Sequence, residues 1–214
     1  QLAGKRYHVL HLMDLWSFSR DYLREQRPDM EQKLDGLAAI IANANESGDY
    51  DEIILVGHST GGALILDAAS RAAERTQNPA FILLTVGSTA LKIGMHPAAS
   101  RFRDRVEKLF TNPGVRWAEY QCLTDVINFY RTDPARHMNL EAAVQTAIRS
   151  IRVKQMVDQT TYKRMRGNFF RTHYQFVFGN TKPYHYDFPA ICFGPHSLDD
   201  RLTLAKPLVG TGDA

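Results

Sequence analysis

The sequence predicts an α/β fold in which a mostly parallel sheet is flanked by helices on both faces. Largely apolar, β-branched and aliphatic runs at 52–56 and 81–86 have the composition of strands that are buried on both faces. Between these runs lie segments with apolar residues at three- and four-residue spacing, which is typical of helices. Strands that alternate with helices favour parallel pairing through right-handed crossovers.

The first elements follow from local patterns. The loose alternation of apolar residues over 7–13 predicts a strand, and 14–27 is expected to be a loop with a short helix. Pro28 begins a clear helix that ends at Gly48. A buried strand over 52–56 and a helix over 63–75 come next.

The second half of the chain continues the alternation. A strand is expected over 81–86, and an amphipathic helix over 97–110. The turn Asn112-Pro113-Gly114 then leads into a strand over 115–121. We expect 140–165 to be mostly helical and 188–193 to be an edge strand. No linker interrupts the pattern, so a single domain over 1–205 is expected, with a loose tail over 206–214.

The composition restricts the class of protein. Hydrophobic residues make up 44% and charged residues 23%, which fits a globular domain of ordinary polarity. The formal net charge of +3 is too small by itself to indicate a nucleic-acid partner. Two cysteines form no disulfide framework, which favours a reducing, cytoplasmic setting. No apolar run approaches the ~20 residues that span a bilayer, and no signal peptide is expected.

Residues 57–61 read Gly-His-Ser-Thr-Gly, at the point where a predicted strand gives way to a predicted helix. Ligands bind beyond the carboxyl ends of strands in such sheets. A serine on so sharp a turn has a strained backbone and an exposed hydroxyl, and we expect Gly57 and Gly61 to remove clashing side chains. The Thr60 N–H, at the start of the helix, would be the first donor to an oxyanion. The pattern predicts a nucleophile elbow with Ser59 as nucleophile.

Two other interpretations of this motif stay open. The pattern also fits a glycine-rich turn with a helix-capping serine. A phosphate-binding loop fits less well, because its Gly-Lys-Ser/Thr ending is absent. The strand before the motif and Gly62-Ala63-Leu64 after it favour the nucleophile elbow.

A serine nucleophile needs a base, and in such enzymes the chain order is serine, then acid, then histidine. Asp125 follows the strand predicted over 115–121, so it should lie at the same sheet edge as Ser59. Asp133, which precedes a proline, is the second candidate for the acid. Either aspartate could instead form a turn.

The chain order places the histidine after the acid. It leaves four candidates: His137, His173, His185 and His196. It disfavours four earlier ones: His8, His11, His58 and His96. His173 lies in an aromatic segment, which favours the neutral imidazole that a base needs. His185 and His196 lie in loops rich in proline, tyrosine and glycine, and the residues alone favour His173 only slightly over His185.

The elbow VGHSTGGALILDAA, the strand LLTVGS, the later acid and a late His-Tyr pair resemble the lipase-like branch of α/β-hydrolases related to class 3 (fungal) lipases. They are most similar to uncharacterised bacterial α/β-hydrolase-like proteins. The resemblance covers roughly residues 50–195, and its most particular part is FFRTHYQFVFGNTKPYHYDF followed by FGP. It implies an α/β-hydrolase-like fold with Ser59 as nucleophile, Asp125 as acid and His173 as base.

The fold normally supplies a second oxyanion N–H from a loop after an earlier strand. Here the loop 14–17 is expected to supply it, through the backbone of Trp16 or Ser17. An open alternative is that early N-terminal strands are missing from this chain, so that the oxyanion hole is incomplete. A first residue Gln1 and a single expected strand before residue 52 fit that alternative.

Residues 149–171 form a basic stretch in which Asp158 is the only acid. Its basic members are Arg149, Arg152, Lys154, Lys163, Arg164, Arg166 and Arg171. The stretch fits a solvated helix face, or a peripheral contact with an anionic membrane surface or an acidic substrate. No stacking platform or motif indicates nucleic acid. The histidines lack metal-ligand spacing, so we expect neither a metal nor a cofactor.

These features together predict a serine hydrolase that cleaves a carboxylic ester through an acyl-enzyme. Seven aromatic residues could wall an apolar pocket and favour a lipid-like or other acyl ester: Trp16, Phe18, Tyr22, Phe129, Tyr130, Phe169 and Phe170. Thioester cleavage and acyl transfer would use the same residues. The alternative is a catalytically inactive α/β-hydrolase-like binding or interaction protein.

Overall fold

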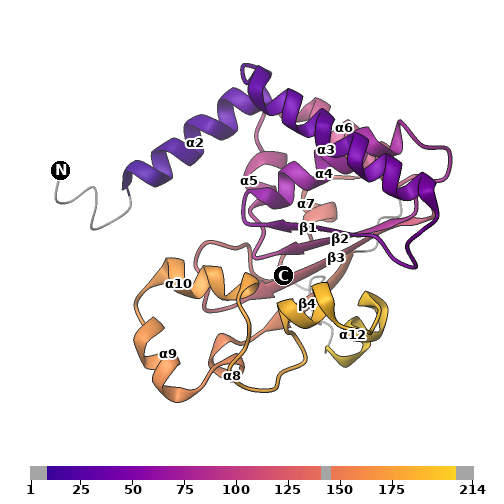
Figure 1. Cartoon of the computed structure of the whole chain (residues 1–214). Helices are drawn as coiled ribbons and strands as arrows, with labels where there is room; N and C mark the ends of the chain where they lie inside the picture. The colour runs from indigo at the N-terminus through magenta and orange to yellow at the C-terminus, as the bar shows by residue number, and fades with distance from the viewer. Residues whose placement is uncertain (1–8, 141–145, 206–214) are drawn as a thin grey trace.

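A parallel sheet of four strands organises the protein (Figure 1). The computed structural model describes residues 9–140 and 146–205. The strands are paired in chain order: β1 (Ile54–His58), β2 (Phe81–Val86), β3 (Val115–Cys122) and β4 (Thr146–Ile151). All three pairings are parallel, so every strand ends at the same edge of the sheet. The predicted parallel sheet is confirmed.

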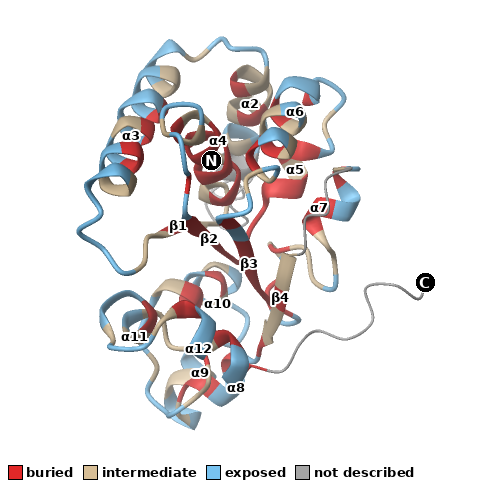
Figure 2. Cartoon of the chain, turned by 90° about the vertical axis from the view of Figure 1, so that its right-hand side faces the viewer, coloured by how far each residue is buried: buried red, intermediate tan, exposed pale blue. Residues whose placement is uncertain are grey.

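Helices cover both faces of the sheet (Figures 1 and 2). One side carries α2 (Val9–Leu23), α3 (Pro28–Ser47), α4 (Gly61–Ala73), α5 (Ala90–Gly94), α6 (Ser100–Leu109) and α7 (Pro134–His137). The other carries α8 (Val153–Met156), α9 (Gln159–Met165), α10 (Phe169–Tyr174), the 3₁₀ turn η1 (Gln175–Val177), α11 (Phe188–Phe193) and α12 (Leu198–Leu204). Crossovers of one hand between strands in sequential order put the connections on one face. The opposite face is therefore left to the helices after β4.

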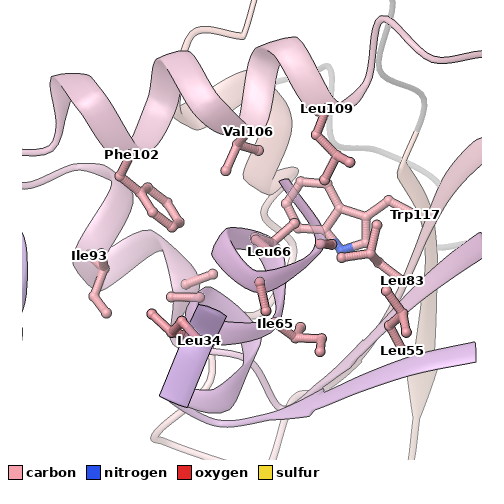
Figure 3. Packing of buried hydrophobic residues seen from close by; sticks show 14 of the residues in the cluster. Leu34, Leu55, Ile65, Leu66, Leu83, Ile93, Phe102, Val106, Leu109 and Trp117 are labelled. Atoms are coloured by element: carbon pink, nitrogen blue, oxygen red, sulfur yellow. The ribbon is translucent and has the colours of Figure 1, made fainter. Parts of the chain in front are cut away.

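Each face of the sheet has its own hydrophobic core. Leu83 and Trp117 point into the first, where they meet Leu66 of α4 and Val106 of α6 (Figure 3). Alternate residues of the same strands point into the second core, which includes Leu84, Tyr120, Phe176 and Tyr186. Full burial of each such side chain stabilises the fold by roughly 1.5–3 kcal/mol. Burial on both faces explains why β2 is apolar at every position except Thr85.

The strand predicted over 7–13 is wrong for the described part, since α2 is helical from Val9. The apolar residues Val9, Leu12, Met13 and Trp16 also have helical spacing, and no glycine or proline interrupts them. Residues 7 and 8 lie outside the described residues. Between residue 9 and β1 the structure contains helix and no strand.

Two later predictions also need correction. Within 140–165, residues 146–151 form strand β4, although α8 and α9 follow as expected; residues 141–145 lie outside the described part. The edge strand expected over 188–193 is the helix α11. Asp187 caps it by accepting the Ala190 N–H at 3.1 Å, and Pro189 occupies its first turn. These helix-start signals prevail over the apolar run.

The limits of the domain stay a prediction. The tail expected over 206–214 lies outside the described residues, and the single domain over 1–205 is not tested by them. None of the described helices is long and apolar enough to cross a membrane. The expected cytoplasmic location likewise stays a prediction.

The turn from β1 into α4 has a strict steric requirement at one glycine and none at another. A Cβ on Gly57 would lie 2.6 Å from the Gly61 carbonyl oxygen and 2.6 Å from Ile65 Cγ2. A Cβ on Gly61 would meet nothing within 4 Å, so the expectation that Gly61 removes a clash is wrong. The second crowded position is Gly62, where a Cβ would press on the Ser88 side chain.

We predict that Gly57→Ala destabilises the protein, by roughly 1–3 kcal/mol, because the added methyl group has no room. Gly61→Ala is the matched control. It fills open space in the first turn of α4, where alanine is the better helix former, so its stability should stay within about 1 kcal/mol of the unchanged protein. Urea unfolding of both variants measures the difference. Equal destabilisation by the two would contradict this account of the turn.

Glu119 is a buried acid on β3, with 3% of its surface exposed. The Thr85 hydroxyl donates to its Oε2 at 2.9 Å, and Gln121 Nε2 donates to its Oε1 at 2.8 Å. Burial raises the pKa of Glu119 from 4.5 to about 7; the two hydrogen bonds oppose the shift and the charge of Asp133 adds to it. The folded protein therefore holds this proton more tightly than the unfolded chain.

We predict that this linkage makes the unchanged protein lose stability as pH rises from about 4.5 to about 7, with no further loss from Glu119 above that. Glu119→Gln, which keeps the shape of the neutral acid, should remove this dependence on pH. The unfolding free energy of the variant minus that of the unchanged protein should therefore be roughly 2–4 kcal/mol larger at pH 8 than at pH 4. Denaturant unfolding across this range, with the exposed Glu46→Gln as control, measures it. A Glu119→Gln profile parallel to the unchanged protein would contradict the assignment.

Candidate active site

Ser59 lies directly after β1, in the turn that leads into α4. Its φ of 57° is in the left-handed region, which costs a non-glycine residue about 1–3 kcal/mol. Backbone contacts hold this conformation. The Ser59 N–H donates to the Val86 carbonyl at 3.3 Å, and the Ser59 carbonyl accepts the N–H groups of Gly62 and Thr89 at 3.0 Å each. The serine is thus fixed at the carboxyl ends of β1 and β2.

The Thr60 N–H at the start of α4 has no acceptor among the described residues. It follows the serine directly and belongs to the end of the helix where the dipole is positive. An anion next to Ser59 could accept a hydrogen bond from this group. The geometry therefore suits the expected role of Thr60 as an oxyanion donor.

Trp16 and Ser17 are placed differently from the expectation. They lie inside α2 and not in a loop. The N–H groups in a helix interior donate to carbonyls one turn earlier, so these two are committed to the helix. The structure therefore does not place Trp16 or Ser17 as oxyanion donors.

Asp125 and His173, 48 residues apart in the chain, meet in a buried hydrogen bond. His173 Nδ1 lies 2.7 Å from Asp125 Oδ2, and each residue exposes only 3% of its surface. Because a carboxylate oxygen accepts, Nδ1 carries the hydrogen, and in the neutral imidazole Nε2 then has the free electron pair. His173 Nε2 is buried and has no hydrogen-bond partner among residues 9–140 and 146–205. The pair has the tautomer that a general base requires.

Asn128 fixes the loop that carries Asp125. Its amide nitrogen donates to the carbonyls of Asp125 at 2.6 Å and Cys122 at 2.9 Å, and its oxygen accepts the Cys122 N–H at 3.0 Å. Asp125 Oδ1 also accepts the Ile127 N–H at 3.0 Å. Sequence reasoning missed Asn128. The available signal was its position three residues after the acid, in a loop after a strand.

His173 lies beside the residues that flank the serine. Its ring is 4.5 Å from the ring of His58, centroid to centroid, and a Cβ on Gly87 would lie 3.3 Å from His173 Cε1. Gly87 follows Val86, which accepts the Ser59 N–H. The described contacts contain no hydrogen bond between Ser59 Oγ and His173 Nε2. The structure therefore brings Asp125 and His173 together, and it places the imidazole next to the turn of Ser59.

His58 was disfavoured by chain order, but it contacts the site closely. Its Nε2 lies 3.2 Å from the His173 carbonyl, which can only accept, so this nitrogen carries a hydrogen. Burial, and then the neighbouring His173, lower the pKa of His58 to about 4. His58 is accordingly a neutral donor that links the serine turn to α10.

The other candidate residues lie elsewhere. Asp133 caps α7 by accepting the N–H groups of Ala135 and Arg136, as the turn interpretation expects. His137 Nδ1 lies against the Asp133 carbonyl at 2.8 Å, and His185 packs on Tyr184 with ring centroids 4.0 Å apart. His196 lines a surface pocket of about 660 Å³ at the opposite edge of the sheet, where the strands begin. Of the late histidines, only His173 has an aspartate partner among the described hydrogen bonds.

The aromatic residues expected to wall a pocket are divided. Tyr22 is buried and donates to Asp67, Phe18 stacks on Tyr22, and Phe129 packs against the first core. Phe169 remains exposed on α10. The described residues contain no cluster of three or more histidine, cysteine or acidic side chains that could hold a metal ion.

Comparison with known proteins gives one match. The model of the alpha/beta hydrolase family matches residues 1–213. No curated protein and no solved structure matches the chain. The branch related to class 3 lipases and the bacterial relatives stay predictions. A parallel sheet with a strained serine between β1 and α4, and a family match over nearly the whole chain, lead to one conclusion: the chain belongs to the alpha/beta hydrolase family.

Proposed function

We propose that the protein is a serine hydrolase that cleaves a carboxylic ester, with Ser59, Asp125 and His173 as its triad. One observation carries the proposal. A buried aspartate holds the imidazole of His173 by Nδ1 and leaves Nε2 without a partner among the described residues, next to a serine on a strained turn. Membership of the alpha/beta hydrolase family supports hydrolase chemistry at this position.

The proposed reaction has two halves. Ser59 Oγ attacks the ester carbonyl carbon and its proton passes to His173 Nε2, while Asp125 stabilises the imidazolium. The Thr60 N–H stabilises the negative oxygen of the tetrahedral intermediate. The C–O bond of the ester then breaks, and the alcohol leaves with the proton from Nε2. Water gives a proton to His173 Nε2 and attacks the acyl carbon. The bond to Ser59 Oγ then breaks, Oγ takes the proton back from Nε2, and the carboxylic acid leaves.

The required contact between Ser59 and His173 breaks no existing hydrogen bond of either atom. Neither Ser59 Oγ nor His173 Nε2 has a hydrogen-bond partner among the described residues, so neither must give up a bond to form this one. Catalytic hydrogen bonds are often long in a free enzyme and tighten when substrate binds. We therefore propose that ester binding brings the two atoms into hydrogen-bond distance.

A second function stays in view, namely a catalytically inactive α/β-hydrolase-like protein that binds a ligand or partner. The observation that favours it is the oxyanion site, for which the described residues supply the Thr60 N–H and leave Trp16 and Ser17 in a helix. Loss of one oxyanion donor costs about 10²–10³ in rate. Reactivity of Ser59 decides between the two functions.

We predict that a fluorophosphonate probe labels the unchanged protein at Ser59, because the phosphorus centre is attacked as an ester carbonyl would be. Ser59→Ala should abolish the labelling. Asp125→Asn should lower its rate by about 10³–10⁴, since the imidazole would lose the partner that fixes its tautomer. Intact-mass spectrometry after timed exposure measures the rates.

The matched control is Asp133→Asn, which changes the other candidate acid and should label within a few-fold of the unchanged protein. Folded protein that resists the probe would overturn the proposal in favour of the inactive binding protein.

His58 is proposed as a positioning residue for the base, because its hydrogen bond holds the backbone of His173. We predict that His58→Phe, which keeps a ring but has no donor, slows labelling of Ser59 by roughly ten-fold, since small displacements in a site are costly. His58→Gln places an amide N–H near the former Nε2 and should restore most of the rate. Thermal unfolding of both variants separates this effect from a loss of stability.

A purely structural role for His58 predicts a different result. In that case, the two variants would label alike once the fraction of folded protein is taken into account. That outcome would remove His58 from the proposed site.

A further inference from the structure

The chain from Gln159 to Tyr186 contains five basic residues and no acidic one. The basic residues are Lys163, Arg164, Arg166, Arg171 and Lys182. All five are exposed in the structure. None of them takes part in the ion pairs found among the described residues, although arginines on the opposite face pair repeatedly, as Arg71 does with Glu31 and Asp67. We call this set the basic segment; its positive side chains are exposed and form no ion pair among the described residues.

Large aromatic side chains are exposed in the same segment. Phe169 exposes 57% of its surface, Tyr174 47% and Phe178 54%. The rings of Tyr174 and Phe178 lie 6.4 Å apart, so two of the three adjoin. Exposed aromatic rings between unpaired arginines and lysines are the composition of surfaces that rest on anionic bilayers, with rings at the acyl boundary and cations at the headgroups.

Helix α10 joins this surface to the candidate active site. His173 faces inward and is buried against Asp125, while Arg171 and Tyr174, three residues apart and so on one side of the helix, are exposed. Tyr174 also packs on His58, with ring centroids 5.5 Å apart. Whatever contacts the outer side of α10 is therefore held beside the imidazole.

We propose that the basic segment and its three aromatic residues form a docking surface for an anionic lipid bilayer. The inference rests on the proposed ester hydrolase for its purpose, because docking there would present an acyl ester of the membrane to Ser59. Each basic residue close to an anionic bilayer raises binding about five-fold. A single-stranded nucleic acid would bind the same cations, but it would also need a groove in which its bases stack on aromatic rings. Here the exposed rings lie on or directly after short helices, which favours the bilayer.

The experiment measures docking without turnover. Full-length Ser59→Ala protein is mixed with phosphatidylcholine vesicles that contain or lack phosphatidylserine, and the bound fraction is determined by sedimentation. We predict binding to the phosphatidylserine vesicles, little binding to phosphatidylcholine alone, and weakening by salt. Arg164→Glu with Arg166→Glu should reduce binding at least ten-fold, and Phe169→Ser should reduce it several-fold at unchanged charge.

The matched control is Arg24→Glu with Lys33→Glu, which changes the net charge equally on exposed residues outside the basic segment. It should bind vesicles within two- to three-fold of the Ser59→Ala protein. Equal loss in both charge-reversal pairs, no binding to phosphatidylserine vesicles, or capture by a single-stranded nucleic acid in preference to vesicles would overturn the docking surface.

Failure of this proposal is distinguishable from failure of the proposed function. Vesicle binding is measured on a protein without the Ser59 hydroxyl, and fluorophosphonate labelling is measured on the unchanged protein without vesicles. The Arg164→Glu, Arg166→Glu pair, placed on a background with Ser59 intact, should label at the unchanged rate in solution. Labelling without vesicle binding would leave the hydrolase standing and remove the bilayer contact.

Discussion

Four parallel strands paired in chain order are the constraint on which the rest of the structure depends. Parallel pairing sends every strand end to one edge, so the turns after β1, β2 and β3 bring Ser59, Gly87 and Asp125 to the same side. Sequential order also commits the crossovers to one face. The other face, with Leu84 and Tyr120 at its centre, must be covered by the chain after β4. That covering layer supplies His173, so the candidate site is completed at the carboxyl ends of the strands, where α10 packs against them.

Burial controls the electrostatics of this meeting point. Asp125 and His173 are removed from water, and each of the aspartate oxygens accepts one hydrogen bond, from Ile127 and from His173. His58 is kept neutral because burial lowers its pKa, so it adds a hydrogen bond to the base without adding charge. Glu119 illustrates the opposite cost, since burial raises its pKa and two donors only partly offset this. Hydrogen bonds, several of them between distant parts of the chain, satisfy these buried polar groups, and the apolar cores supply the free energy that offsets the cost of burying them.

Helix α10 has two environments within six residues. Its inner side carries the buried imidazole, and its outer side carries a cation and an aromatic ring. Asn168 caps the helix by accepting the Arg171 N–H at 3.0 Å. This cap fixes where the helix begins, and so which residues lie on its inner and outer sides. The candidate site and a surface with unpaired positive charge are thereby carried by one short helix. This arrangement is the one that the proposed docking of the hydrolase on a bilayer requires.

The sequence by itself determined the features that depend on neighbouring residues. Pro28 and Gly48 mark the ends of α3, the aliphatic run marks β2, and the strand–serine–helix pattern marks the turn of Ser59. Local patterns failed at 9–13 and 188–193, where apolar residues fit either element and a helix formed. Only the tertiary structure decided which histidine meets Asp125 and showed that His58 contacts that histidine. It also decided that a side chain at Gly62, and not at Gly61, would be crowded. The physical reason is that short-range signals fix backbone shape over a few residues, whereas contacts between distant residues depend on how the two helical layers pack on the sheet.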